Sequence, residues 1–228
     1  MKIIGIILAM EEELNSILNE LQSYETKEIK NIKFIESTIN NNKIILALSG
    51  VGKVNSARCT QILIDLYNPN LIINTGVAGA CTNNLKLLDI VVANKLYQHD
   101  FDITVFNHNL GYVPLIGDYN ESEEELINDF INKTKDKYNI KKGAIASGDQ
   151  FINTIEQKQK ISENFGALCC EMESASIAQV AKLNNIQFLI IRVISDVLTN
   201  DSNKEYEDYL NASCNVSANI LINYLKQI

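Results

Sequence analysis

Metal-ligating and redox-active residues are scarce in this chain of 228 residues. There are two histidines, His99 and His108, and no cysteine or histidine stands at metal-ligand spacing from them. The five cysteines form no CxxC pair, and two of them are adjacent. These features argue against a zinc site, and we expect the protein to use neither a metal nor a cofactor. Reduced thiols are typical of a cytoplasmic protein, which is the location that we expect.

Basic residues are also few, with 20 against 28 acidic ones and a net charge of −8. A nucleic-acid backbone or an anionic membrane needs a basic patch, so the charge balance argues against both as main partners. Only Arg58 and Arg192 are arginines. No apolar run approaches the roughly 18 residues that a membrane span requires. The apolar start MKIIGIILAM lacks a small-x-small cleavage site and leads into three glutamates, which favours a buried strand over a signal peptide.

Common nucleotide-binding and hydrolase motifs are missing. The segment LSGVGKV (48–54) resembles a phosphate loop, but Ala47 stands where that motif needs glycine and Val54 where it needs serine or threonine. The segment GVAGA (76–80) is not the GxGxxG of dinucleotide-binding folds. A GxSxG nucleophile elbow is absent. Most metal, redox and serine-hydrolase chemistry is therefore excluded.

What the sequence does contain is an alternation of strand-like and helix-like segments. With 46% hydrophobic residues, two prolines and no linker-like stretch, the chain predicts one domain over residues 1–228. Repeated strand–helix units favour an α/β fold with a mainly parallel sheet covered on both faces, and a hairpin makes the sheet mixed. The predicted strands are 2–9, 33–39, 43–48, 71–75, 89–94 and 187–194, with short ones at 144–147 and 167–170, and the predicted helices are 11–22, 53–67, 122–137, 172–184 and 205–226.

The ends of the predicted strands indicate where a ligand binds. In open α/β sheets, ligands lie beyond the carboxyl ends of the strands. Three acidic side chains and several glycines follow such ends, so we expect them to gather along one edge. The least periodic segment, 98–121, is long for a connection and is a candidate substrate-facing loop. The segments that follow strand ends are 10–13, 76–81, 148–152, 171–173 and 195–196.

Six short motifs in fixed order resemble one enzyme family. They are AMEEEL (9–14), SGVGKVNSA (49–57), NTGVAGA (74–80), SGDQFI (147–152), EMESASIA (171–178) and IRVISD (191–196). Together they resemble the 5′-methylthioadenosine/S-adenosylhomocysteine nucleosidases of the nucleoside phosphorylase superfamily, from residue 1 to about 225. The resemblance implies a three-layer α/β/α sandwich, a homodimer, and hydrolysis of the N-glycosidic bond of these nucleosides to adenine and a thioribose in methionine salvage.

The resemblance also implies catalytic roles. Glycosidic cleavage needs an acid for the leaving group and a carboxylate for water. Asp196 follows an apolar strand, so burial should raise its pKa, and the resemblance makes it the acid that protonates the purine. The sequence alone does not show which of Glu11, Glu12 and Glu13 activates the water, whereas the resemblance selects Glu13. It also implies that Glu173 binds the ribose and that Arg192 pairs with Glu173.

Further positions are implied to form the substrate pocket. Phe151 is expected to stack on adenine, and the Ile152 backbone to read the edge of the base. Val77 stands where the family often has serine, which leaves only its backbone for hydrogen bonding. A pocket for the 5′-thioether is expected from Ile103, Phe106 and Pro114, with Tyr206, contributed by a neighbouring subunit. The remaining expected substrate contacts are Met10, Val51, Ala78, Gly79, Glu171, Met172 and Ser195.

Three alternatives remain open at this point. Hydrolysis of aminodeoxyfutalosine would use the same chemistry with a bulkier 5′ group. A purine nucleoside phosphorylase would bind phosphate, which favours several arginines, and the chain has two. A non-catalytic nucleoside-binding protein would be expected to have lost one of the three acids, yet Glu13, Glu173 and Asp196 are all present.

Overall fold

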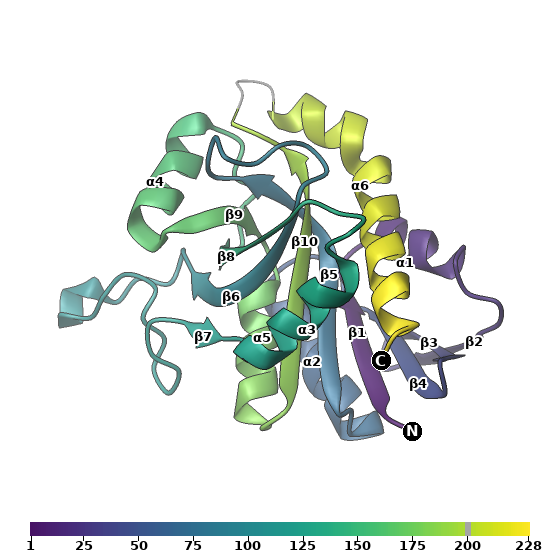
Figure 1. Cartoon of the computed structure of the whole chain (residues 1–228). Coiled ribbons are helices and arrows are strands. Elements are labelled where there is room, and N and C mark those ends of the chain that lie inside the picture. Colours follow the sequence, from purple (N-terminus) through teal and green to yellow (C-terminus); the bar gives the residue numbers. More distant parts are fainter. Residues whose placement is uncertain (199–201) are drawn as a thin grey trace.

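The computed structural model, which describes residues 1–198 and 202–228, has a mixed sheet between two layers of helices (Figure 1). The described strands join in the order β10-β6-β8-β9-β5-β1-β4-β3-β2, with β7 beside β6. The strands are β1 (Ile3–Leu8), β2 (Glu25–Ile29), β3 (Ile32–Ile39), β4 (Asn42–Leu48), β5 (Leu71–Ala80), β6 (Ile90–Gln98), β7 (Asn120–Glu121), β8 (Ile140–Ser147), β9 (Ala167–Glu171) and β10 (Gln187–Asp196). The helices are α1 (Glu11–Leu18), α2 (Lys53–Tyr67), the short 3₁₀ helix η1 (Thr104–Phe106), α3 (Glu124–Thr134), α4 (Ile155–Phe165), α5 (Ser174–Leu183) and α6 (Ser202–Leu225).

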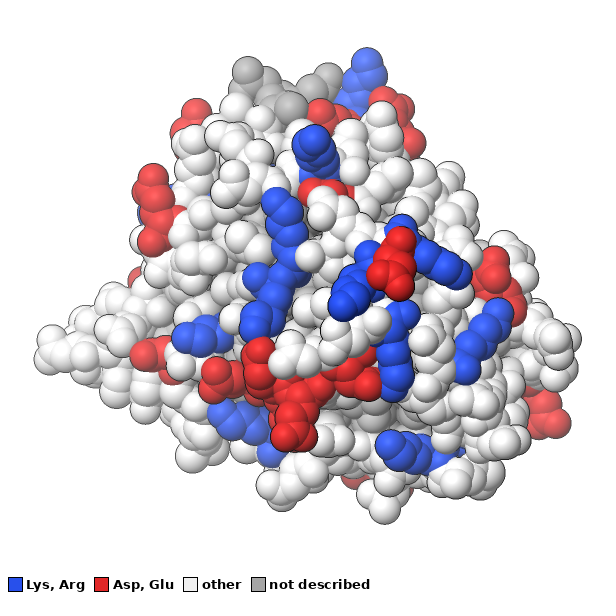
Figure 2. All heavy atoms as spheres, in the orientation of Figure 1, with Lys and Arg blue, Asp and Glu red and all other residues white. Residues whose placement is uncertain are grey.

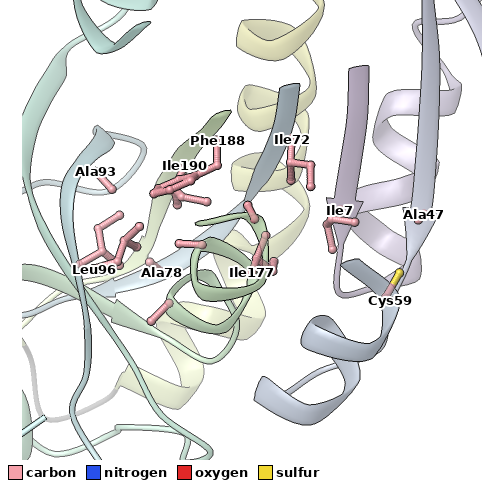
Figure 3. Close-up of a cluster of buried hydrophobic side chains, with 14 of the residues drawn as sticks. Ile7, Ala47, Cys59, Ile72, Ala78, Ala93, Leu96, Ile177, Phe188 and Ile190 are labelled. Atoms are coloured by element: carbon pink, nitrogen blue, oxygen red, sulfur yellow. The ribbon is translucent and has the colours of Figure 1, made fainter. Parts of the chain in front are cut away.

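Two apolar clusters separate the three layers. On one face of the sheet, α2 and α5 bury residues such as Cys59 and Ile177 against strand residues such as Ile7 and Ile190 (Figure 3). On the other face, α1, α3 and α6 form a second cluster with side chains from the same strands. A third, smaller cluster lies between α4 and strands β8 and β9. The predicted α/β/α sandwich with a mixed, mainly parallel sheet is therefore confirmed.

Strand β5 is the centre of the sheet and is buried over its whole length. It pairs in parallel with β1 and with β10, and its last residues pair antiparallel with β9. The prediction ended this strand at residue 75 and placed 76–81 beyond its end, which was wrong because the strand continues to Ala80. The glycine-rich segment stays in the sheet because β10 on one side and β9 on the other satisfy its backbone.

The sequence analysis missed strand β2, helix α4 and, within the segment 98–121, the short elements η1 and β7. Strand β2 lies at the sheet edge and is mostly exposed, so it lacks an apolar run. Helix α4 buries Lys158, Ile161 and Phe165, which lie on one face at helical spacing. A lysine occupies the first of those positions, so the apolar stripe that predicts a helix is incomplete.

The charged residues do not form one continuous basic surface on the face drawn in Figure 2. There, lysine and arginine side chains lie scattered among acidic and uncharged ones. Across residues 1–198 and 202–228, no helix combines the length and the hydropathy that crossing a membrane requires.

Candidate active site

A cavity of about 160 Å³ opens where β1, β5, β9 and β10 end. Its wall includes every predicted site residue except Ile103, Phe106 and Pro114. The three acids that lie far apart in the sequence, Glu13, Glu173 and Asp196, therefore meet around one space. The predicted residues in the wall are Met10, Glu13, Val51, Val77, Ala78, Gly79, Phe151, Ile152, Glu171, Met172, Glu173, Arg192, Ser195, Asp196 and Tyr206, and the wall also includes Ala9, Gln150 and Cys170.

Of the three consecutive glutamates at the start of α1, only Glu13 is buried, and Glu11 and Glu12 are exposed. The Glu13 carboxylate accepts hydrogen bonds from the backbone N–H groups of Ala9 at 2.9 Å, Met10 at 3.1 Å and Val77 at 3.3 Å. Burial raises the pKa of Glu13, while the Arg192 charge and these N–H groups oppose the rise. Glu13 is thus the one of the three that the fold buries beside the cavity, and it is the one that the resemblance selects.

Strand β5 makes room for Glu13 because residue 76 has no side chain. A Cβ at Gly76 would collide with Oε1 of Glu13 and with Nη1 of Arg192. The glycine therefore lets a carboxylate and a guanidinium lie directly above the strand. This contact explains why the segment carries a glycine inside a buried strand, where glycine otherwise costs stability.

Asp196 lies at the end of β10 and is 2% exposed. Its Oδ1 accepts a hydrogen bond from the Ser195 hydroxyl at 3.0 Å, and its Oδ2 forms an ion pair with Lys158 of α4. Burial raises the pKa of Asp196, and the Lys158 ammonium opposes the rise. A raised pKa keeps a carboxyl group protonated closer to neutral pH, which suits a general acid.

Arg192 is the buried cation beside the other two acids. Its closest carboxylate is Glu171, and Oε2 of Glu173 lies 3.6 Å from Nη2. The expected pairing with Glu173 is therefore present but secondary, because β9 presents Glu171 directly to the guanidinium. Arg192 also donates to the side chains of Asn74 at 2.6 Å and Ser174 at 2.8 Å.

Glu171 was expected to contact the substrate, and in the structure protein donors surround its carboxylate. One of its carboxylate oxygens accepts from the Ser147 hydroxyl, and the other from Arg192, from the Ser174 hydroxyl at 2.8 Å and from two backbone N–H groups. Both oxygens are thus occupied by protein donors. Although Glu171 lines the cavity, its carboxylate is engaged by Arg192 and these other protein donors.

Glu173 is the acid that faces the open space with the fewest protein donors. Its Oε1 accepts from the backbone N–H of Gly52 at 2.9 Å. Burial, together with the nearby Glu171 charge, raises the pKa of Glu173 to about 8, against the opposing effect of Arg192. A positive charge that develops nearby would lower the pKa of Glu173 and favour its ionised form.

Phe151 and Tyr206 form the aromatic side of the cavity. Their ring centroids lie 5.3 Å apart at 75°, and the Tyr206 hydroxyl lies 3.3 Å from the Met10 sulfur. Tyr206 was expected to come from a neighbouring subunit, but it lines the cavity of its own chain. The reason is that α6 packs along α1 and β10, which returns its first turns to the end of β10.

The three residues outside the cavity belong to the segment 98–121. Phe106 is 71% exposed, and neither Ile103 nor Pro114 lies in the cavity wall of the same chain. The sequence analysis missed Ala9, Gln150 and Cys170 in the cavity wall and Lys158 behind it. Lys158 gave no signal because a lysine on a polar helix is ordinarily solvent-exposed.

Comparison with known proteins agrees with this geometry. The phosphorylase superfamily model matches residues 3–226. The 5′-methylthioadenosine/S-adenosylhomocysteine nucleosidase of Staphylococcus haemolyticus is 35% identical over 98% of this chain and 99% of that protein. The chain belongs to this nucleosidase family.

Solved structures of the nucleosidase family and a close relative share the whole fold. A Helicobacter pylori mutant of the nucleosidase with 5′-methylthioadenosine in its active site has a TM-score of 0.96 and 31% identity, covering 100% of both chains. A mutant of Helicobacter pylori futalosine hydrolase also has a TM-score of 0.96, with 32% identity over 100% of both chains. The same overall architecture is therefore shared by a nucleosidase and a futalosine hydrolase.

Proposed function

We propose that this protein hydrolyses the N-glycosidic bond of 5′-methylthioadenosine and S-adenosylhomocysteine, releasing adenine and the thioribose product. The observation that carries the proposal is the convergence of Glu13, Glu173 and Asp196 on one cavity, in a chain that belongs to the nucleosidase family. The reaction needs an acid at the base, a carboxylate at the water and a group that grips the sugar, and the cavity offers three buried acids.

Asp196 acts as the acid in this proposal. It donates its proton to the five-membered ring of the purine as the glycosidic bond breaks, so that adenine leaves as a neutral molecule. Burial raises the pKa of Asp196, which favours the protonated form that a general acid needs. Phe151 stacks on the adenine, and the backbone of Ile152 reads its edge.

Glu13 and Glu173 act on the sugar side. Glu13, fixed by three backbone N–H groups, orients water and takes its proton as the water attacks the anomeric carbon. Glu173 holds a proton near neutral pH in the ligand-free protein, so in this proposal it releases that proton to solvent as substrate binds. The resulting carboxylate accepts hydrogen bonds from the ribose hydroxyls and stabilises the oxocarbenium-like transition state. Met172, Val77, Ala78 and Gly79 form the surface against which the ribose lies.

Water is favoured over phosphate as the acceptor of the ribosyl group. A phosphate dianion bound without a metal calls for several arginines. The only arginine in the cavity wall is Arg192, and it is already engaged by Glu171 and Asn74. The chain's other arginine, Arg58, donates to the backbone carbonyl of Lys30 instead. Hydrolysis is therefore preferred to phosphorolysis.

The test is adenine release from 5′-methylthioadenosine with and without phosphate. We expect turnover without phosphate, no stimulation by phosphate, and free thioribose as the second product. The Asp196→Asn protein should fold normally and lose nearly all turnover. Phosphate-dependent release with a sugar 1-phosphate would overturn hydrolysis, and tight nucleoside binding with no release would indicate a binding protein.

A second candidate function is hydrolysis of aminodeoxyfutalosine, and the full-length likeness to futalosine hydrolase favours including it. The base, ribose and acids are used in the same way, and only the 5′ group differs. Competing the two substrates against each other separates the candidates. A kcat/KM for aminodeoxyfutalosine tenfold or more above that for methylthioadenosine would reverse their order.

We further propose that the protein works as one catalytic domain in a cytoplasmic homodimer that contributes to methionine salvage. Exposed apolar side chains on the segment 98–121 support the dimer, because Val105 is 82% and Phe106 71% exposed. In this arrangement Ile103, Phe106 and Pro114 reach the thioether of a substrate in the partner subunit. The mass measured by sedimentation tests the dimer, and a monomer at assay concentration would exclude it.

A further inference from the structure

Helix α4 places a fully buried lysine behind the acid. Lys158 is 0% exposed, forms an ion pair with Oδ2 of Asp196 and donates to the backbone carbonyl of Val197 at 3.1 Å. It is not in the cavity wall, so it reaches the reacting atoms only through Asp196. A lysine is almost never fully buried unless it is paired, and taking its charge out of water is costly. The fold keeps the Lys158 charge beside Asp196 despite this cost, and a role in the chemistry of Asp196 would explain why.

The other groups around Asp196 supply no positive charge. Within the residues that the structure describes, Lys158 is the only cation within 4.0 Å of the Asp196 carboxylate. The neighbouring β5 residue, Gly79, has no side chain. The other titratable or hydroxyl groups that interact with Asp196, by a hydrogen bond or through their charge, are Ser195 of β10, the thiols of Cys169 and Cys170 on β9, and Glu205 and Tyr206 of α6.

The proposed reaction leaves a negative charge on the side chain of Asp196. When the O–H bond of Asp196 breaks and an N–H bond forms on the purine, the electron pair stays on the aspartate as a buried carboxylate. An isolated buried carboxylate is strongly disfavoured. The Lys158 side chain lies against that carboxylate as its ion-pair partner, so it offsets the charge as the charge forms.

We propose that Lys158 is a positioning residue that stabilises the Asp196 carboxylate formed during proton transfer and thereby makes Asp196 a stronger acid in the transition state. The inference rests on the proposed function of the site. Because the Lys158 charge favours the ionised form of Asp196, its removal should leave Asp196 protonated to higher pH but slower to release its proton. The same interaction, together with the bond to the Val197 carbonyl, fixes the end of β10.

The test replaces Lys158 by an uncharged side chain of similar length. For Lys158→Met we expect kcat for methylthioadenosine to fall about 10- to 100-fold, with KM within about threefold. In the dependence of kcat on pH, the basic limb is the fall in activity that occurs as Asp196 loses its proton. This limb should shift to higher pH by about one unit or more. Lys158→Arg, which keeps the charge, should recover most of kcat and return the limb toward its original position.

Two controls separate this role from a structural one. Lys160→Met changes an exposed lysine of the same helix and should leave kcat and the pH profile unchanged. If Lys158→Met does not fold, Lys158→Gln, which retains a hydrogen-bond donor, carries the same test. A folded uncharged variant with wild-type kcat and an unmoved basic limb would overturn the inference, and so would equal losses in the Met and Arg variants. Failure of wild-type protein to release adenine would instead overturn the proposed function.

Discussion

Gly79 of β5 and Asp196 of β10 lie opposite each other in the parallel pair, and a Cβ on Gly79 would come within 2.8 Å of Oδ2 of Asp196. The register of the two strands shifts between Ile194 and Asp196, which turns the acid toward the cavity. The absence of a side chain at position 79 is therefore part of how the acid is placed.

The Gly79→Ala variant should displace Asp196 and lower kcat about 100-fold, since a shift of about 1 Å in a catalytic group can cost that much. The measurement is steady-state kinetics with methylthioadenosine, together with a crystal structure of the variant. Gly166→Ala is the matched control, because a Cβ there meets no atom within 4 Å but sits at a φ of +62°. That control should lose about 1 kcal/mol of stability and keep its activity.

The Arg192–Glu171 pair should show strong coupling in stability. Arg192→Met leaves the buried Glu171 carboxylate without its cation, which should lower the free energy of unfolding by about 3–5 kcal/mol. The double variant Glu171→Gln/Arg192→Met removes both charges and should be more stable than Arg192→Met. Urea unfolding of the wild type, Glu171→Gln, Arg192→Met and the double variant measures the four free energies. Additive losses in the double variant would contradict the pairing.

Glu173 should make the ligand-free protein less stable as the pH rises. Its pKa is raised from 4.5 to about 8, so between these values the folded state holds a proton that the unfolded state has lost. The free energy of unfolding must then fall as pH rises through this range, by a few kcal/mol at about 1.4 kcal/mol per unit. Glu173→Gln should remove this fall.

The measurement for Glu173 is chemical denaturation at pH 5 and pH 8 of the wild type and the variant. The quantity compared is the difference between the two proteins, which cancels the titration of all other groups. Glu12→Gln, at an exposed position of α1, is the control and should follow the wild type. A Glu173→Gln protein with the same slope as the wild type would show that burial does not raise this pKa.

Phe151→Leu should weaken substrate binding with little effect on the chemical step. Stacking of a base on an aromatic ring contributes about 1–3 kcal/mol, so we expect KM to rise about tenfold or more and kcat to change less than threefold. The Phe151 side chain is 49% exposed, so its replacement should not affect folding. Tyr24→Leu, at a 47% exposed aromatic outside the cavity, should leave KM unchanged. A larger effect on kcat than on KM would contradict a stacking role.

Much of the fold could be predicted because its signals are local. Helix α2 was predicted with the bounds that it has, and the buried strands β1 and β10 were found within two residues at each end. Their apolar runs reflect burial on both faces of the sheet. Strand β2 and helix α4 were missed because their few buried positions are not enough to make a pattern.

The candidate site followed from the rule that ligands bind at the carboxyl ends of strands, combined with the six motifs. Its polar network could not be predicted in the same way. Nothing in the sequence distinguishes Lys158 from the exposed lysines, or shows that Arg192 prefers Glu171 to Glu173. Such preferences depend on distances between elements that are far apart in the chain.

The sequence by itself determined the class of fold, the family and the set of acidic side chains at the strand ends, because hydrophobic pattern and ordered motifs are properties of the chain alone. Only the tertiary structure decided which glutamate of 11–13 is buried, which cation faces Asp196 and that Tyr206 lines the cavity of its own chain. These outcomes depend on burial and on ion pairs between distant segments, and both exist only once the layers have packed.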